Sequence, residues 1–135
     1  MAKQGGNFET AVKEIFESYG YIVSEKKSIR VYENQRPWQL DLHVAKGNKE
    51  AVIEIKVQKS SGSCYEKVDF GCRKLTKVAK RTKANKAMVV YGGSKMQRFM
   101  ASHPLAQEMK RDYSEIEFIS IDDLKLKLMD NGCIF

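Results

Sequence analysis

Two carboxylates stand on neighbouring runs of alternating apolar and polar residues in the stretch 39–58, QLDLHVAKGNKEAVIEIKVQ. This alternation predicts two half-buried strands, and Gly47-Asn48 between them suits a two-residue hairpin turn. With that turn, Asp41 lies directly opposite Glu54 on the same face of the hairpin. Opposed Cβ atoms lie about 4.5–5.5 Å apart, so the two charges repel each other unless a cation lies between them. The hairpin therefore predicts a metal site.

The chemistry that such a site supports is hydrolysis of a phosphate ester. Mg²⁺ prefers carboxylate oxygens and keeps water molecules for a substrate. Lys56, two residues after Glu54, projects from the same face, where its amine can orient or deprotonate a water or neutralise a phosphate. A turn of three or five residues would destroy this register. From spacing alone, an ordinary solvated hairpin face explains the same charges.

Basic residues are concentrated in one part of the chain. The net charge is +7, with a pI near 9.3, and the segment 67–86 holds eight basic residues against the single acid Asp69. The rest of the chain is close to neutral. A solvated helix face is the plain interpretation, but clustering of one sign favours a polyanionic partner such as nucleic acid.

Hydrophobic periodicity predicts the elements that position these residues. In chain order they are a helix at 7–19, a strand region at 21–31 interrupted around 25–27, strands at 38–44 and 51–58, a helix at 65–79, a strand at 86–91, a helix at 95–113 broken near Pro104, a strand at 116–121 and a helix at 122–129. This order predicts one α/β domain over 1–135, a mixed central sheet flanked by helices on both faces.

The strand at 38–44 alternates strictly, so its apolar residues are expected on one face. These residues are Trp38, Leu40, Leu42 and Val44. Trp38, at the entry of the hairpin, is expected in the core, although it could also touch DNA.

Asp41, followed thirteen residues later by Glu54-Ile55-Lys56, resembles the motif of the PD-(D/E)xK nuclease superfamily, which has the restriction-endonuclease-like fold. The order of elements over about 7–91 is similar to the αβββαβ core of that superfamily. The resemblance implies that Asp41, Glu54 and the backbone carbonyl of Ile55 bind Mg²⁺, for which Mn²⁺ can substitute. It also implies that Lys56 acts on the attacking water.

The resemblance extends to flanking residues. It implies that Glu9 of the first helix joins the metal site and that Gln58 extends the motif to ExKxQ. Leu40 is a departure, because it stands where the superfamily motif has Pro. The segment 60–67 is similar to one that leads into a helix near DNA in restriction-type members. Contacts to nucleic acid are therefore expected from Lys59, just before this segment, and from residues of the segment and of the basic helix: Ser60, Ser63, Lys67, Arg73, Lys74, Lys77, Lys80 and Arg81.

These observations predict an Mg²⁺-dependent endonuclease that hydrolyses DNA, either restriction-like or similar to archaeal-type Holliday-junction resolvases. A homodimer is expected, since two sites are needed to cut both strands. Two alternatives remain open: a catalytically silent nucleic-acid-binding module on the same fold, and a nuclease that processes RNA.

Other features favour a cytoplasmic protein without a membrane segment or small-molecule cofactor. No apolar run approaches membrane-spanning length, and the start MAKQGGNFETAVKE lacks the apolar core of a signal peptide. The three cysteines are an odd number without a CxxC pair, so they predict reduced thiols rather than a disulfide or zinc framework.

Overall fold

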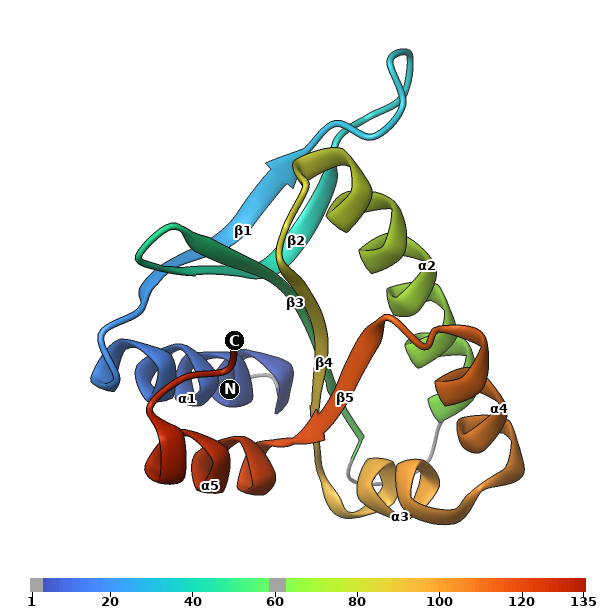
Figure 1. Ribbon diagram of the computed structural model, residues 1–135. Helices are drawn as coiled ribbons and strands as arrows, with labels where there is room; N and C mark the ends of the chain where they lie inside the picture. Colours follow the sequence, from blue (N-terminus) through green and yellow to red (C-terminus); the bar gives the residue numbers. More distant parts are fainter. Residues whose placement is uncertain (1–3, 59–62) are drawn as a thin grey trace.

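The computed structural model describes residues 4–58 and 63–135 and arranges them as helices around one sheet (Figure 1). The elements are α1 (Gln4–Ser18), β1 (Ile22–Ile29), β2 (Trp38–Lys46), β3 (Lys49–Val57), α2 (Cys64–Thr82), β4 (Lys86–Gly92), α3 (Ser94–Ser102), α4 (Pro104–Asp112), β5 (Ile116–Ser120) and α5 (Ile121–Asn131). The predicted α/β order is confirmed, and the expected break near Pro104 divides one helical segment into α3 and α4.

The sheet follows the order of the sequence, β1-β2-β3-β4-β5. The first three strands are antiparallel neighbours, whereas β3, β4 and β5 run parallel. Helices α1 and α5 cover one face, and α2, α3 and α4 cover the other (Figure 1). The sheet is therefore mixed and covered on both faces, as the sequence predicts.

The β2–β3 hairpin has the predicted register. Lys46 pairs with Lys49, and the pairing continues to Leu42 and Ile53. Gly47 in the turn has φ +65°, a conformation that glycine adopts without the strain a Cβ would cause. The next pair in this register is Asp41 and Glu54, where the backbone ladder ends.

The β1–β2 pairing is interrupted at the same point. Glu25 pairs with Leu42 and Lys27 with Leu40, but Lys26 between them has φ +50° and makes no ladder pair. The interruption predicted around 25–27 is therefore confirmed. It lies opposite Asp41, so both ladders that flank β2 are broken at this one residue.

Two apolar cores lie on the two faces of the sheet. One packs β-strand residues against α2, and Leu40 belongs to it. The other packs against α1 and α5, and it contains Leu42 and Val44. The expectation that these three residues share one face is wrong, because β2 turns over at Asp41, where neither neighbour holds it in a regular ladder.

Cys72 lies on the buried face of α2, where burial raises the pKa of its thiol to about 12.

Within 4–58 and 63–135, no helix is long and apolar enough to cross a membrane.

Candidate active site

The carboxylates of Asp41 and Glu54 each accept a hydrogen bond from a backbone amide of the facing strand, where the ladder between β2 and β3 ends. The Asp41 amide donates to Glu54 Oε2 at 3.0 Å, and the Ile55 amide donates to Asp41 Oδ2 at 2.7 Å. Each carboxylate thus takes the place of a backbone carbonyl of the neighbouring strand. The strands part at this point, and the two carboxylates fill the gap between them.

Glu54 is fully buried and lies against two lysines. Its Oε1 lies 2.7 Å from Lys74 Nζ and 3.6 Å from Lys56 Nζ. Neither contact gives Oε1 a well-directed hydrogen bond, and no other described residue supplies one. Burial, and next the charge on Asp41, raise the pKa of the Glu54 carboxyl, although Lys74 opposes this shift. Glu54 Oε1 is therefore a buried acceptor that is held by the charge of two lysines and not by a well-directed hydrogen bond.

Lys56 reaches the site through space that a glycine leaves in α2. A Cβ built on Gly71 would lie only 2.8 Å from Lys56 Cε. Glycine inside a helix costs about 1 kcal/mol relative to alanine, so this residue weakens α2 by itself. The space is filled by the Lys56 side chain, which is 20% exposed. Gly71 thereby helps to set the position of the amine.

Lys74 of α2 is a second amine in the site. The basic segment predicts a nucleic-acid contact at this position, but the Lys74 side chain is only 13% exposed and pairs with Glu54. Its Nζ also donates to the backbone carbonyl of Gln39 at 2.9 Å. A signal for this position exists in the sequence, because Lys74 follows Gly71 by three residues and precedes Val78 by four, at the edge of the buried stripe of the helix.

Glu9 of α1 approaches the carboxylates from another element. Burial, and next the charge on Asp41, raise the pKa of its carboxyl, while Lys26 acts in the opposite direction. Its Oε1 is buried and accepts no hydrogen bond from the described residues. The structure thus brings Glu9 close to Asp41, where the superfamily resemblance places it.

Gln58 connects the end of β3 to two helices. Its side-chain Oε1 accepts from Lys67 Nζ at 2.7 Å, and its backbone carbonyl accepts from the Met96 amide at 2.9 Å. Gln58 is buried, and its backbone amide donates a hydrogen bond to the Gly92 carbonyl of β4. Lys67, another expected nucleic-acid contact, therefore donates its hydrogen bond to Gln58, the last residue of the ExKxQ sequence.

The protein ligands fit a metal that keeps most of its own water. Among the residues that the structure describes, no group of three or more His, Cys, Asp and Glu side chains is arranged to hold a metal. Asp41, Glu54 and the Ile55 carbonyl fit Mg²⁺ nevertheless, because this ion binds through one or two carboxylates and retains several waters. The buried oxygens of Glu54 and Glu9, neither of which accepts a well-directed hydrogen bond from the described residues, would supply acceptors for such an ion.

The basic segment divides into exposed and paired residues. Lys74 and Lys86 are partly buried in ion pairs with carboxylates. The six others are exposed: Lys67, Arg73, Lys77, Lys80, Arg81 and Lys83. All the exposed members except Lys83 lie on α2, so this helix carries a positive surface beside the site.

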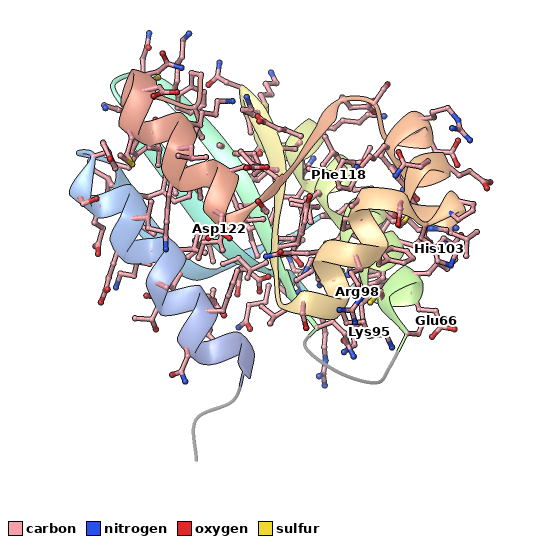
Figure 2. All side chains as sticks on the ribbon, turned by 90° about the horizontal axis from the view of Figure 1, so that it is seen from below. Glu66, Lys95, Arg98, His103, Phe118 and Asp122 are labelled. Carbon is pink, nitrogen blue, oxygen red and sulfur yellow. The ribbon has the colours of Figure 1, made fainter. Side chains whose placement is uncertain are left out.

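Two further basic residues, Lys95 and Arg98 of α3, lie near the start of α2, where Glu66 is found (Figure 2). They were not expected, because a strand separates them from the basic segment in the sequence.

Ser63, an expected nucleic-acid contact, caps α2 by accepting a hydrogen bond from the Glu66 amide at 3.4 Å. Lys59 and Ser60 lie outside the described residues.

The chain belongs to the PD-(D/E)XK nuclease superfamily. The family model of the PD-(D/E)XK nuclease superfamily domain matches residues 1–128, almost the whole chain. Nucleases of this superfamily act on nucleic acid and generally use divalent metal ions. No curated protein matches the chain.

Solved structures share the fold. A protein of unknown function, AF1548, superposes with a TM-score of 0.60 at 12% identity, over 84% of this chain and 56% of that one. SfsA of Pyrococcus furiosus, determined in complex with Ca²⁺, gives a TM-score of 0.50 at 19% identity, over 87% of this chain and 55% of that one. The chain thus spans little more than half the length of either neighbour.

Proposed function

We propose that this chain is a divalent-metal-dependent endonuclease that hydrolyses phosphodiester bonds of DNA, with Mg²⁺ as its metal and Mn²⁺ as a substitute. The observation that carries this proposal is the state of Glu54, which is buried beside Asp41 with an oxygen that lacks a well-directed hydrogen bond. Two carboxylates held together at this cost are expected where a cation binds.

Each residue of the proposed site has its own role. Asp41, Glu54 and the Ile55 carbonyl would hold the metal, and Glu9 would support it directly or through a water. When bound, the metal polarises the phosphate and lowers the pKa of a water. Lys56 Nζ, which faces Glu54, orients this water or neutralises charge on the phosphate.

Lys74 positions the Glu54 carboxylate rather than contacting DNA. Its amine bridges that carboxylate and the Gln39 carbonyl, so it fixes one end of the β2–β3 opening. The exposed basic residues of α2 would bind phosphates and supply affinity. A homodimer would let two such sites act on both strands, as a restriction-like or junction-resolving enzyme must.

One observation favours the alternative of a silent nucleic-acid-binding module. Lys74 Nζ lies 2.7 Å from Glu54 and gives that carboxylate a positive neighbour without any metal. A protein that had lost its metal would need a cation of this kind to keep Glu54 buried.

A cleavage assay separates the two functions. Purified protein is incubated with supercoiled, linear and four-way-junction DNA, and with RNA, in Mg²⁺, Mn²⁺, Ca²⁺ or EDTA. We expect cleavage of DNA in Mg²⁺ and Mn²⁺ and none in EDTA. Tight binding without cleavage under every condition would establish the silent module, and cleavage of RNA alone would establish the RNA nuclease.

The Lys56→Ala variant tests the assignment of the site. It should fold and bind DNA, yet cleave roughly 10²–10⁴-fold more slowly, the usual effect of losing such a group. Lys56→Arg should keep the charge without restoring proton transfer, because a guanidinium does not deprotonate near neutral pH. Lys127→Ala removes an amine that pairs with Glu117 of β5, so it is the control and should cleave normally. Equal rates for Lys56→Ala and the wild type would show that the site is misassigned.

A further inference from the structure

An aromatic cluster lies beside the site, between the β1–β2 loop and α2. The rings of Tyr32 and Trp38 have centroids 5.9 Å apart and meet edge to face, and Trp38 and Phe70 have centroids 6.4 Å apart. We call these three residues the aromatic platform. Tyr32 is 44% exposed and Phe70 is 59% exposed. Rings that served only to pack the loop onto α2 would be covered, as Phe16 is in the core.

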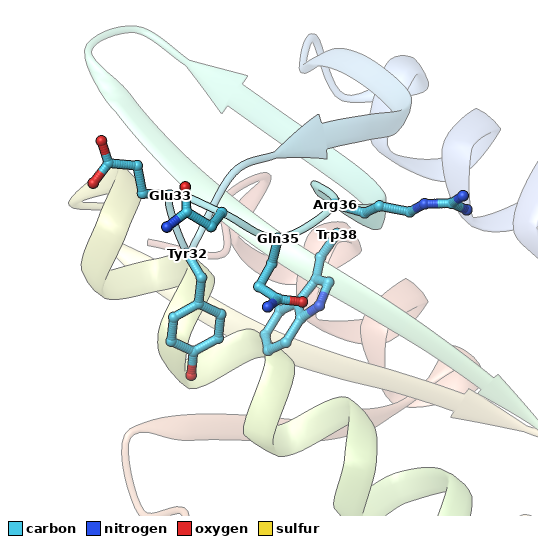
Figure 3. Close-up of a pocket in the computed structure, with 6 residues that line it drawn as sticks. Tyr32, Glu33, Gln35, Arg36 and Trp38 are labelled. Atoms are coloured by element: carbon cyan, nitrogen blue, oxygen red, sulfur yellow. The ribbon is translucent and has the colours of Figure 1, made fainter.

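The platform borders an open hollow of about 690 Å³, lined by residues 32–36 and Trp38. Figure 3 shows the Tyr32 and Gln35 side chains beside the Trp38 indole, while Glu33 points away from the rings. The lining therefore combines aromatic faces with the amides of Asn34 and Gln35 and the guanidinium of Arg36, and its acidic residue is turned away from the rings. An amide beside aromatic faces suits the edge of a nucleotide base.

A second hollow, of about 280 Å³, shares Tyr32 with the first. Its other lining residues are Val31, Lys77, Lys80 and Arg81. Lys77 Nζ lies 5.5 Å from the centroid of the Tyr32 ring, within cation–π distance. Tyr32 thus stands between a hollow of aromatic character and one bordered by three positive charges. A base and the phosphate next to it need this pair of environments.

The platform adjoins the site along two elements. Trp38 precedes Asp41 by three residues on β2, a distance of about 10 Å along a strand. Phe70 is next to Gly71, which makes room for Lys56. Bases stacked in one strand rise about 3.4 Å each, so the platform lies within a few nucleotides of a phosphate at the carboxylates.

We propose that the aromatic platform stacks unpaired bases of a single-stranded segment of the DNA, whose phosphates lie on Lys77, Lys80 and Arg81. This inference rests on the proposed nuclease function and deepens it, since it names the substrate class as DNA that is unpaired next to the cut. Aromatic faces bind any unpaired base, whereas the bases of a duplex are already stacked on one another. The exposed rings and the adjoining cations meet both requirements of such binding.

Trp38 provides a direct measurement, because it is the only tryptophan of the chain. Its fluorescence is recorded while oligo(dT) or a blunt duplex of the same length is added in EDTA, where no cleavage occurs. We expect saturable quenching by oligo(dT) and little change with the duplex. Phe70→Leu and Tyr32→Leu should each weaken binding of oligo(dT) by about 30-fold, near the middle of the range for one stacked base, and leave duplex binding unchanged.

Two further variants serve as controls, one for the tyrosine hydroxyl and one for the position of the aromatic ring. Tyr32→Phe keeps the ring and should bind oligo(dT) as the wild type does. Tyr65→Leu removes another exposed aromatic side chain of α2 that lines a different hollow, and it should have no effect. Circular dichroism checks that each variant is folded.

The result that overturns the proposal is oligo(dT) binding without quenching of Trp38, or with unchanged affinity in both Tyr32→Leu and Phe70→Leu. The platform would then be internal packing or a surface for a protein partner. Failure of the proposed function is a separate outcome. A wild type that binds oligo(dT) through the platform but cuts nothing supports the platform and rejects the nuclease, and the reverse pattern rejects only the platform.

Discussion

Two carboxylates of the sheet each lie against two lysines, yet their charges are balanced differently. Glu117 of β5 pairs with Lys86 and with Lys127, and about a quarter of its side chain remains exposed. Burial opposes ionisation of Glu117, but the two ion pairs outweigh it and lower the pKa of the carboxyl. Two lysines thus face the single carboxylate of Glu117, and the pair with Lys127 joins α5 to the sheet.

Glu54 has the same two kinds of partner but a different balance. It has no exposed surface, and Asp41 brings a second negative charge into the same gap. The pKa of Glu54 is raised for these reasons in spite of Lys74. The number of ion pairs therefore does not by itself decide the pKa of a carboxyl. Glu54 is fully buried and has the charge of Asp41 beside it as well as its two lysines, whereas Glu117 is partly exposed and has two lysines for one carboxylate.

The largest expected effect separates the two carboxylates by activity. Glu54→Gln keeps an oxygen that can accept from the Asp41 amide, but it removes the charge that would hold the metal. Cleavage should fall on the order of 10³-fold or more, since several kcal/mol of charge stabilisation are lost. Glu117→Gln is the matched control and should cleave within about twofold of the wild type, because Glu117 lies on β5 and pairs with Lys86 and Lys127 instead of the lysines beside Glu54. Equal losses in the two variants would contradict the comparison.

A smaller effect is expected from Gly71→Ala. Alanine improves helix propensity by about 1 kcal/mol, so the thermal stability of the protein should not fall. The added methyl group would displace Lys56 Cε, and cleavage should slow by about 10–100-fold, since a displacement of 1 Å costs as much.

A double mutant shows whether the loss in Gly71→Ala acts through Lys56. In the Lys56→Ala background, Gly71→Ala should cause no further decrease in rate, because the displaced amine is already absent. Additive losses would mean that Gly71 acts elsewhere.

Lys74 and Lys127 provide a comparison of stability. Lys74→Met leaves the buried Glu54 short of a partner and should lower the free energy of unfolding by about 1–3 kcal/mol in EDTA. Mn²⁺ should restore more stability to this variant than to the wild type, because it replaces the missing charge. In Lys127→Met the loss should be no more than about 1 kcal/mol and should not respond to metal. Thermal unfolding with and without Mn²⁺ checks both, and the same metal response in the two variants would contradict the assignment.

The smallest effect is the dependence of stability on pH, and its sign differs between the two carboxylates. Because the pKa of Glu117 is lowered in the folded state, its charge stabilises the protein above the ordinary value of 4.5. This stabilisation is lost as the pH falls through the lowered value. Glu117→Gln should therefore be less stable than the wild type at pH 7, and the difference should shrink below about pH 4.5.

For Glu54 the raised pKa means that ionisation costs folding free energy, and this cost grows as the pH rises above 4.5. Glu54→Gln should therefore be more stable than the wild type at pH 7 in EDTA, even though it is inactive. Urea unfolding at pH 4 and pH 7 measures both variants. A Glu54→Gln protein that is less stable at pH 7 would show that the lysines already compensate the charge.

Much of the fold could be predicted from the sequence, because its signals are local. Strict alternation and the Gly47-Asn48 turn determine the hairpin register, and that register brings Asp41 to Glu54. The interruption of the first strand and the break at Pro104 also come from nearby residues.

What could not be predicted depends on interactions between distant segments. Leu40 and Leu42 belong to different cores because the ladder ends at Asp41, and alternation contains no information about such a twist. Lys74 was grouped with exposed lysines because charge alone does not show which way a side chain at the edge of a buried stripe is turned. The aromatic platform joins residues far apart in the sequence, so neither Tyr32 nor Phe70 was singled out.

The conformation of Lys26 also has a consequence for the exposed edge of the sheet. Strand β1 lies at the edge of the sheet, and an open edge can recruit a strand from another molecule and start aggregation. The left-handed conformation of Lys26 interrupts the row of backbone donors and acceptors, and Lys27 beside it adds a second charge. The irregularity that interrupts the ladder opposite Asp41 therefore also makes this edge a poorer template for a strand of another molecule.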